Sequence, residues 1–187
     1  QAELEREFLR GGLAHMGYSS IVAAGRNSAV LHYHRNSARI LDGDLLLVDA
    51  GAECRGYTAD VTRTFPVRGR FSPRQREIYE LVLSAQKECI ARSVPGITSG
   101  ELHRHSCLVL GQGLLDLGLA KGTAEELVET EAIRVFYPHG LTHMLGLDVH
   151  DVQGGRKRRV PPSKGTKKLR FNARLEPGFV ITMEPGL

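Results

Sequence analysis

The pattern of apolar and polar positions predicts strands in the first third of the chain. Residues 19–24 have strand composition, and residues 45–48 form a continuous apolar run after an Asp-Gly turn. Such a run predicts a strand that is buried on both faces. Residues 57–65 are rich in Thr, Val and aromatic side chains, which predicts another strand. Alternation along it puts Asp60, Thr62 and Thr64 on one face and Val61, Arg63 and Phe65 on the other.

Helical periodicity covers much of the remaining chain. It opens the sequence, over residues 1–17. Three later helices begin with capping boxes, in which a Ser or Thr cap precedes Gln or Glu by three residues. Their predicted spans are 72–93, 98–117 and a short helix from 123. The apolar segment 179–183 predicts a last strand. Because strands and helices do not alternate regularly, the pattern favours an α+β fold.

Length, cysteines and charge narrow the class of protein. A chain of 187 residues predicts one domain. No apolar run reaches about 18 residues, so no membrane-spanning helix is expected. The three cysteines are far apart and form no Cys-x-x-Cys pair, which predicts reduced thiols in a cytoplasmic protein. Residues 156–174 hold nine Lys or Arg and no acidic residue, so the net charge of +4 arises from one local segment.

Two aspartates occupy positions where a carboxylate needs a strong partner. Asp49 ends the apolar strand, and Asp60 lies in the next predicted strand. Burying a carboxylate without a partner costs several kcal/mol. Either residue alone fits a turn cap or an ion pair with Arg63. Two such carboxylates on neighbouring strands favour one shared cation.

Three histidines fall within one short segment that glycines interrupt. They are His139, His143 and His150. Imidazole is a common metal ligand and exchanges protons near neutral pH, and packing alone does not explain three of them here. Glu184 closes the last predicted strand, so its carboxylate is expected at the edge of a core. Glu176 has the same Glu-Pro-Gly context but precedes that strand, and we expect it to be a solvent-facing turn residue.

Together these side chains form a hard, oxygen-rich ligand set. Two Asp, one His and one Glu suit Mn²⁺, Mg²⁺ or Fe²⁺, with Zn²⁺ and Co²⁺ as alternatives. In two-metal hydrolases, bridging carboxylates hold paired ions about 3.5–4 Å apart.

The order and wording of four segments resemble the Xaa-Pro aminopeptidase and prolidase family. The segments are VDAG, YTADVTRTFP, PHGLTHMLGLDVHD and TMEPG. The resemblance covers nearly the whole chain, and the histidine-rich segment is its most specific part. Methionine aminopeptidases share the order Asp, Asp, His, Glu but look less similar around the histidines. The resemblance implies a pita-bread (creatinase/aminopeptidase) fold, with residues 1–187 as a metallopeptidase catalytic domain.

The resemblance also implies a role for each candidate residue. Two divalent metal ions are expected, with Mn²⁺ preferred over Co²⁺, Zn²⁺ or Fe²⁺. The implied metal ligands are Asp49, Asp60, His143 and Glu184, with Asp60 bridging both ions. The implied catalytic residues are His139, His150 and Glu184. The implied substrate-binding residues are His32, His139 and His150.

The implied reaction is hydrolysis of the peptide bond before proline by a metal-activated hydroxide. An Xaa-Pro aminopeptidase and an Xaa-Pro dipeptidase both fit, with a proline-containing peptide as substrate. The family's N-terminal domain and its final C-terminal strands, one of which carries a fifth, bridging glutamate, are not found between Gln1 and Leu187. We therefore expect a fold that is incomplete at its C-terminus, weak binding of the second ion, and an open sheet edge that favours a homodimer.

Two alternatives remain beside a peptidase. A non-catalytic pita-bread module that binds protein or nucleic acid is favoured only by the basic segment 156–174. That segment has no aromatic side chain for base stacking beyond Phe171, which argues against nucleic acid. A metal-free enzyme of the creatinase kind would lack the four candidate ligands that this sequence contains.

Overall fold

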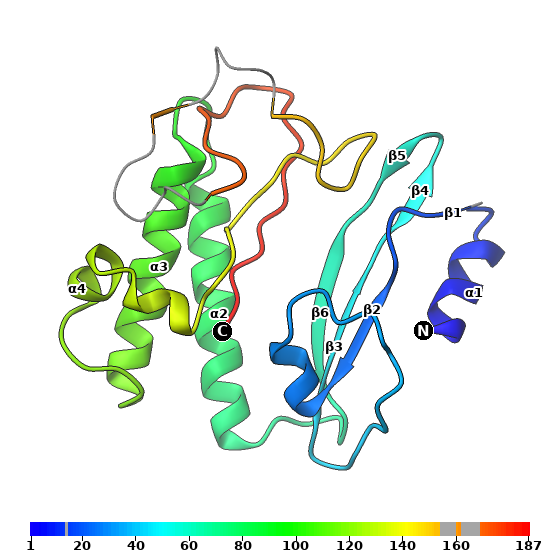
Figure 1. Ribbon diagram of the computed structural model, residues 1–187, viewed down its shortest axis with the longest axis horizontal. Helices are drawn as coiled ribbons and strands as arrows, with labels where there is room; N and C mark the ends of the chain where they lie inside the picture. The colour runs from blue at the N-terminus through cyan, green and yellow to red at the C-terminus, as the bar shows by residue number, and fades with distance from the viewer. Residues whose placement is uncertain (14, 154–159, 162–168) are drawn as a thin grey trace. The chain divides into compact units, whose positions relative to one another are not determined.

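A computed structural model of the protein describes residues 1–13, 15–153, 160–161 and 169–187. These residues fall into two compact units (Figure 1). Unit 1 consists of residues 1–75 and 145–151, and unit 2 of residues 76–144 and 152–187. Strands and helices are both present, and they do not follow a regular alternation. This agrees with the predicted α+β class.

Unit 1 is built around one long antiparallel hairpin. Its strands are β3 (Leu45–Ala50), β4 (Ala52–Cys54), β5 (Tyr57–Thr58) and β6 (Val61–Pro66). The turn between β4 and β5 consists of Arg55 and Gly56, which have φ values of 55° and 85°. Two residues with positive φ form the type I′ turn, whose twist matches that of a hairpin. The pairing keeps one register from Cys54 opposite Tyr57 to Leu45 opposite Pro66.

Two short strands complete the sheets of unit 1. They are β1 (His15–Met16), which pairs with β4, and β2 (Ile21–Ala24), which pairs with β3. The resulting sheet orders are β1-β4-β5 and β2-β3-β6. The remaining elements are helix α1 (Ala2–Arg10) and the 3₁₀ turn η1 (Gly25–Ala29). Helix α1 is shorter than the predicted span of 1–17, because the chain turns at Gly11 and at Gly12, whose φ is +84°.

Two predictions about the hairpin are wrong in detail. Only Ala50 of β3 is buried and its other residues are half-buried, so this strand is not buried on both faces. Asp60 lies between β5 and β6 instead of inside one strand.

A Cβ atom at Gly51 would lie 1.7 Å from the carbonyl oxygen of Ala59. The backbones therefore approach so closely beside Asp60 that only glycine fits at position 51.

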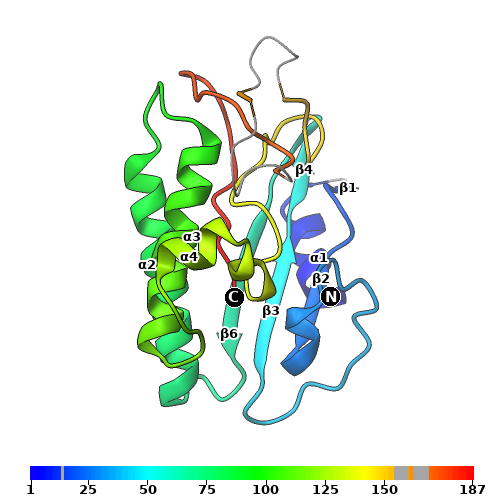
Figure 2. The ribbon, with the colours of Figure 1, turned by 60° about the vertical axis from the view of Figure 1, so that its left-hand side comes forward.

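Unit 2 is mainly helical. It contains α2 (Pro73–Arg92, apart from its first residues), α3 (Ser99–Asp116), α4 (Ala124–Glu129) and the 3₁₀ turn η2 (Ala132–Val135). The three predicted capping boxes are confirmed. The hydroxyls of Ser72, Thr98 and Thr123 accept N–H groups three residues later, and the Gln or Glu side chains accept the N–H groups of the caps. Helices α2 and α3 lie side by side (Figures 1 and 2).

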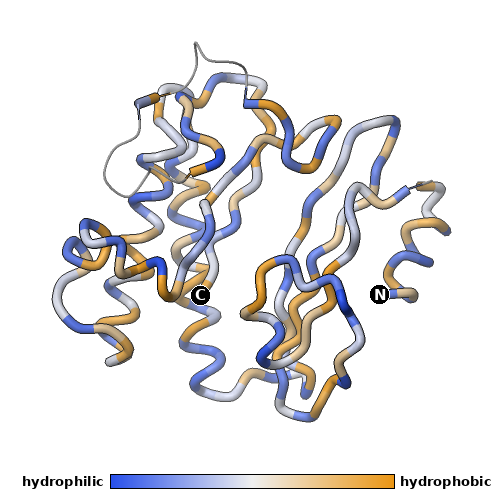
Figure 3. The backbone as a smooth tube through the Cα atoms, viewed as in Figure 1, coloured by the Kyte–Doolittle hydropathy of each residue, from blue (hydrophilic) through white to orange (hydrophobic). Residues whose placement is uncertain are grey.

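The helices of unit 2 enclose two apolar clusters. The tube in Figure 3 shows hydrophobic and hydrophilic positions alternating along α2 and α3. One cluster joins Ala85 of α2 to Leu110 and Leu114 of α3 and includes Tyr137. The other holds Cys89, Leu102, Leu141, Phe171, Ala173 and Leu175. Burial of this kind stabilises the fold by roughly 25 cal/mol for each Å² of apolar surface removed from water.

The last predicted strand, 179–183, is not a regular strand. Its contacts to the histidine-rich segment are an isolated bridge between Met144 and Ile181 and backbone bonds from Thr182 N to His143 O and from Glu184 N to Leu141 O. Apolar composition favours a strand, but a strand also needs a partner of similar length. Among the described helices, none is long and apolar enough to cross a membrane.

Candidate metal centre

The two candidate aspartates come together in unit 1. Asp49 pairs across the hairpin with Thr62, two residues beyond Asp60. Directly opposed residues in an antiparallel pair point to the same face, so the alternation predicted for this strand brings the two carboxylates to one face. Both reach the same hydroxyl. Tyr18 donates to Asp49 Oδ1, and Asp60 Oδ1 lies 3.2 Å from the Tyr18 oxygen.

Tyr18 is a permanent donor in this arrangement. Burial, followed by the hydrogen bond and the negative charge of Asp49, raises the pKa of the Tyr18 hydroxyl well above its usual range. A protonated phenol offers one hydrogen to two acceptors. Two carboxylates that lie close together form a negatively charged pair, and such a pair attracts a cation.

A second pair forms in unit 2. His143 Nε2 lies 3.0 Å from Glu184 Oε1, with the His143 side chain 9% exposed and that of Glu184 39%. His143 Nδ1 lies 2.9 Å from the carbonyl oxygen of Met144. The Thr182 hydroxyl donates to the same Glu184 oxygen at 2.7 Å and accepts the backbone N–H of His143 at 3.1 Å.

The contacts of His143 limit which of its ring nitrogens can carry a hydrogen. The Met144 carbonyl can only accept, so Nδ1 of His143 carries a hydrogen. In a neutral imidazole Nε2 is then an acceptor, and it faces a carboxylate oxygen that also only accepts. The contact is stable if Nε2 is protonated or if a cation binds between the two groups. A histidine whose other ring nitrogen donates to a backbone carbonyl has the usual arrangement of a metal ligand. The donor chemistry therefore fits a divalent ion.

His139 lies in unit 2 with its ring held on two sides. Its Nδ1 lies 2.9 Å from the Gly140 carbonyl oxygen, and the ring of Tyr137 meets it edge to face at 4.8 Å between centroids. A Cβ atom at Gly186 would lie 2.9 Å from His139 Nε2. Because Nδ1 donates to the carbonyl, Nε2 is the nitrogen that can exchange a proton with another group.

His32 and His150 lie in unit 1, and both are exposed. Their ring centroids are 6.3 Å apart, and the ring of His34 stacks near His32 at 6.1 Å. His32 has a φ of 53°, a left-handed conformation that is uncommon for residues other than glycine. Glu176, as predicted, lies exposed at a turn.

Unit 1 thus brings Asp49 to Asp60 and His32 near His150, and unit 2 brings His143 to Glu184 and also holds His139. Within the described part of each unit, no three His, Cys, Asp or Glu side chains gather closely enough to hold one metal ion. The predicted set of four ligands around two ions therefore stays a prediction.

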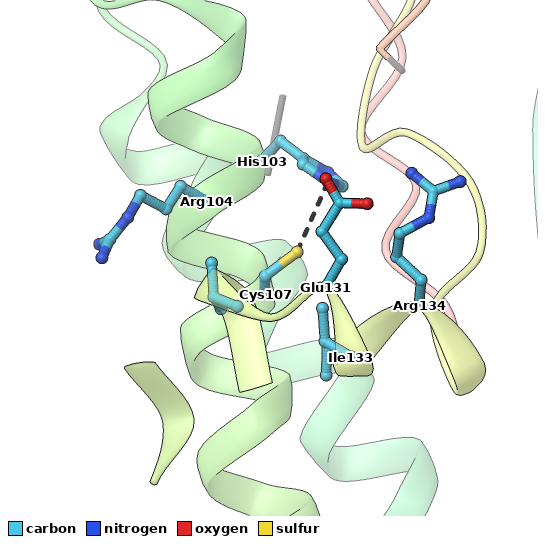
Figure 4. A pocket seen from close by; sticks show the side chains of 7 residues that line it. His103, Arg104, Cys107, Glu131, Ile133 and Arg134 are labelled. Atoms are coloured by element: carbon cyan, nitrogen blue, oxygen red, sulfur yellow. Dashed lines mark hydrogen bonds between the residues drawn. The ribbon is translucent and has the colours of Figure 1, made fainter. Parts of the chain in front are cut away.

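A small pocket in unit 2 contains none of the predicted site residues. His103, Cys107, Glu131, Ile133 and Arg134 contribute to its wall (Figure 4). His103 Nε2 lies 3.5 Å from the Cys107 thiol. Burial lowers the pKa of His103 to about 4 and raises that of Cys107 to about 12, so both side chains are neutral near pH 7. All three cysteines of the chain are free thiols.

Two residues of these groups were not identified from the sequence. Tyr18 lies 31 residues before Asp49, and no local pattern connects them. Thr182 stands two residues before Glu184 in an extended segment. Alternation places such residues on one face, so the sequence did contain a signal for Thr182.

Comparison with known proteins connects these groups to a family. The sequence pattern that defines metallopeptidase family M24 matches residues 1–187 of this chain. The Xaa-Pro aminopeptidase of Haemophilus influenzae is 48% identical over 187 residues, and that of Escherichia coli 42% over 189 residues. Each alignment covers all of this chain, and the chain spans 41% and 40% of the two relatives.

Solved structures agree with this match. Aminopeptidase PepP of Pseudomonas aeruginosa superposes with a TM-score of 0.87 at 48% identity, covering 98% of this chain and 39% of that one. Zinc-substituted E. coli aminopeptidase P, in complex with product, gives a TM-score of 0.87 at 42% identity, with the same coverage. The chain has the pita-bread fold that the sequence implied, and it belongs to metallopeptidase family M24.

Proposed function

We propose that the protein is a metal-dependent exopeptidase that hydrolyses the peptide bond before proline, with residues 1–187 as its catalytic domain. The relatives that match the whole chain are named Xaa-Pro aminopeptidases, which favours an aminopeptidase over a dipeptidase. The observation that carries the proposal is the contact of His143 Nε2 with Glu184 Oε1. An imidazole nitrogen and a carboxylate oxygen face each other there, and both can be ligands of one divalent ion when the nitrogen carries no hydrogen.

We propose that Asp49, Asp60, His143 and Glu184 hold two divalent ions. Three of these four ligands are carboxylates, which suits Mn²⁺, with Co²⁺, Zn²⁺ or Fe²⁺ as alternatives. The bound ions would lower the pKa of a water molecule and polarise the substrate carbonyl. Asp60 is proposed to serve both ions, as the resemblance to the family implies, and Tyr18 connects it to Asp49.

The histidines are proposed to bind substrate and to move protons. His139 would act through Nε2, since its Nδ1 donates to the Gly140 carbonyl. In the protonated ring, Nε2 can donate its hydrogen to a developing oxyanion or to the nitrogen of the leaving proline, which leaves a neutral imidazole. His32 and His150 would contact the peptide, since both rings are exposed and lie 6.3 Å apart. Glu184 would bind metal and take part in proton transfer.

The chain contains a matched pair of residues for a test. Glu184 and Glu176 both precede a Pro-Gly pair, but Glu176 is an exposed turn residue. Mn²⁺ binding by titration calorimetry and hydrolysis of an Xaa-Pro peptide are measured for Glu184→Ala, Glu176→Ala and Asp60→Ala. We expect Glu184→Ala and Asp60→Ala to lose binding and hydrolysis, and Glu176→Ala to retain both. A folded wild-type protein that binds none of Mn²⁺, Co²⁺ and Zn²⁺ would overturn the proposal.

The alternative of a protein-binding or nucleic-acid-binding module receives no support from the described residues. It rests on the basic segment 156–174, of which 156–159 and 162–168 lie outside the described residues. Of the described cations, Arg174 donates to the Gly96 carbonyl and thus contributes to the fold of unit 2. A homodimer stays a prediction.

A further inference from the structure

The segments that carry His143 and Glu184 run antiparallel with a defined register. Thr182 N donates to His143 O at 3.0 Å, Glu184 N donates to Leu141 O at 2.9 Å, and Met144 pairs with Ile181. These three contacts share one register, in which residue 143 lies opposite residue 182. Backbone hydrogen bonds therefore place Thr182 beside His143, and this placement does not depend on contacts between the two side chains.

The Thr182 hydroxyl joins this backbone to the Glu184 carboxylate. Its oxygen accepts the N–H of His143 at 3.1 Å, and its hydrogen goes to Glu184 Oε1 at 2.7 Å. The direction of both bonds is fixed, because an amide N–H can only donate and an ionised carboxylate can only accept. Thr182 is 9% exposed, so water competes little for these bonds.

Two independent contacts therefore hold one carboxylate oxygen. Glu184 Oε1 receives the Thr182 hydroxyl and faces His143 Nε2 at 3.0 Å. Both contacts lead back to residue 143, one through its backbone N–H and one through its ring. His143, Thr182 and Glu184 therefore each contact the other two, and these contacts restrict the conformations of all three side chains.

We propose that Thr182 is a positioning residue, whose hydroxyl fixes the Glu184 carboxylate against His143 Nε2 before a metal ion binds. The proposal rests on the proposed function in one respect, the assignment of His143 and Glu184 as ligands. Hydrogen-bond partners of metal ligands typically change metal affinity by about 10–100-fold when they are removed. A flexible glutamate loses side-chain entropy when it is fixed, and prior fixation by Thr182 removes that cost from metal binding.

The test compares Thr182→Val, which keeps the shape and removes the hydroxyl, with Thr182→Ser, which keeps the hydroxyl. Mn²⁺ affinity is measured by titration calorimetry. We expect Thr182→Val to weaken Mn²⁺ binding about tenfold or more and Thr182→Ser to bind like the wild type. Equal binding by all three proteins, or equal loss in both variants, would overturn the proposal, because neither result depends on the hydroxyl. If Thr182→Val does not fold, Thr182→Ala takes its place.

A second readout needs no metal ion. Crystal structures of the metal-free wild type and Thr182→Val locate the Glu184 carboxylate, and hydrogen exchange reports the His143 amide. We expect Glu184 to turn away from His143 in the variant and the amide to exchange about tenfold faster, the equivalent of one lost hydrogen bond. A carboxylate that stays in place refutes the positioning role. If the wild type binds no metal but the carboxylate turns, the proposed function fails and the positioning role stands.

Discussion

Replacing Gly51 by alanine should disrupt the hairpin beside the carboxylate pair. The added Cβ would lie 1.7 Å from the Ala59 carbonyl oxygen, whereas real Cβ atoms essentially never come closer than 3.0 Å. The strands must therefore separate by more than 1 Å, which breaks the 3.0 Å bond from Ala59 N to Ala52 O. Forced overpacking costs about 1–3 kcal/mol, and a lost backbone bond adds about 1 kcal/mol. We expect the free energy of unfolding to fall by about 2–4 kcal/mol.

Urea denaturation and thermal melting measure this loss, which corresponds to a fall in Tm of roughly 10 °C. Gly111→Ala in α3 is the matched control. Its Cβ would meet Ala124 atoms at 3.6 Å, an ordinary contact, and alanine favours a helix over glycine by up to about 1 kcal/mol. We expect that variant to be as stable as the wild type or more so. If Gly51→Ala is no less stable than Gly111→Ala, the close approach at Ala59 does not exist and the reasoning is refuted.

Two further predictions concern Tyr18, which is half-buried, and His103, which is buried. Tyr18→Phe removes the donor shared by Asp49 and Asp60 and should lower the free energy of unfolding at pH 7 by about 1–3 kcal/mol; a value equal to that of the wild type in urea denaturation would contradict this. Burial lowers the pKa of His103 to about 4, so between pH 6.5 and 4 the unfolded chain binds a proton that the folded protein does not. Stability should fall as the pH drops through this window, by up to about 1.4 kcal/mol per pH unit. In urea denaturation at pH 4.5 to 7, His103→Gln should reduce the change of unfolding free energy with pH. If that change is the same as in the wild type, groups other than His103 cause it.

The helices could be predicted because their start signals are local. Thr98 and Thr123 accept N–H groups three residues away, and no distant contact is needed to recognise this pattern. Strand ends were less predictable. Asp60 lies outside a regular strand, at a place where the backbone comes close to Gly51, and the residues around Asp60 do not reveal that approach. Residues 179–183 have strand composition, but their neighbours at 141–144 form only one bridge with them.

The candidate metal ligands were predictable in part for similar reasons. Alternation along residues 57–65 and pairing with the apolar strand indicate that Asp49 and Asp60 share a face. The opposition of Thr182 and His143 depends on a register between distant segments, which one sequence does not reveal. The same is true of Tyr18, which lies between β1 and β2 and whose hydroxyl contacts both carboxylates.

The Arg55-Gly56 turn has a consequence for the order of folding. Closing this hairpin brings Asp49 and Asp60 together across a short loop, so the loss of chain entropy is small. Hairpins of this kind form in about 1–10 μs. Thr182 meets His143 only after a segment of 39 residues has closed, and contacts of greater sequence separation form more slowly. During folding, the two aspartates should therefore be in place well before the histidine and glutamate have found each other.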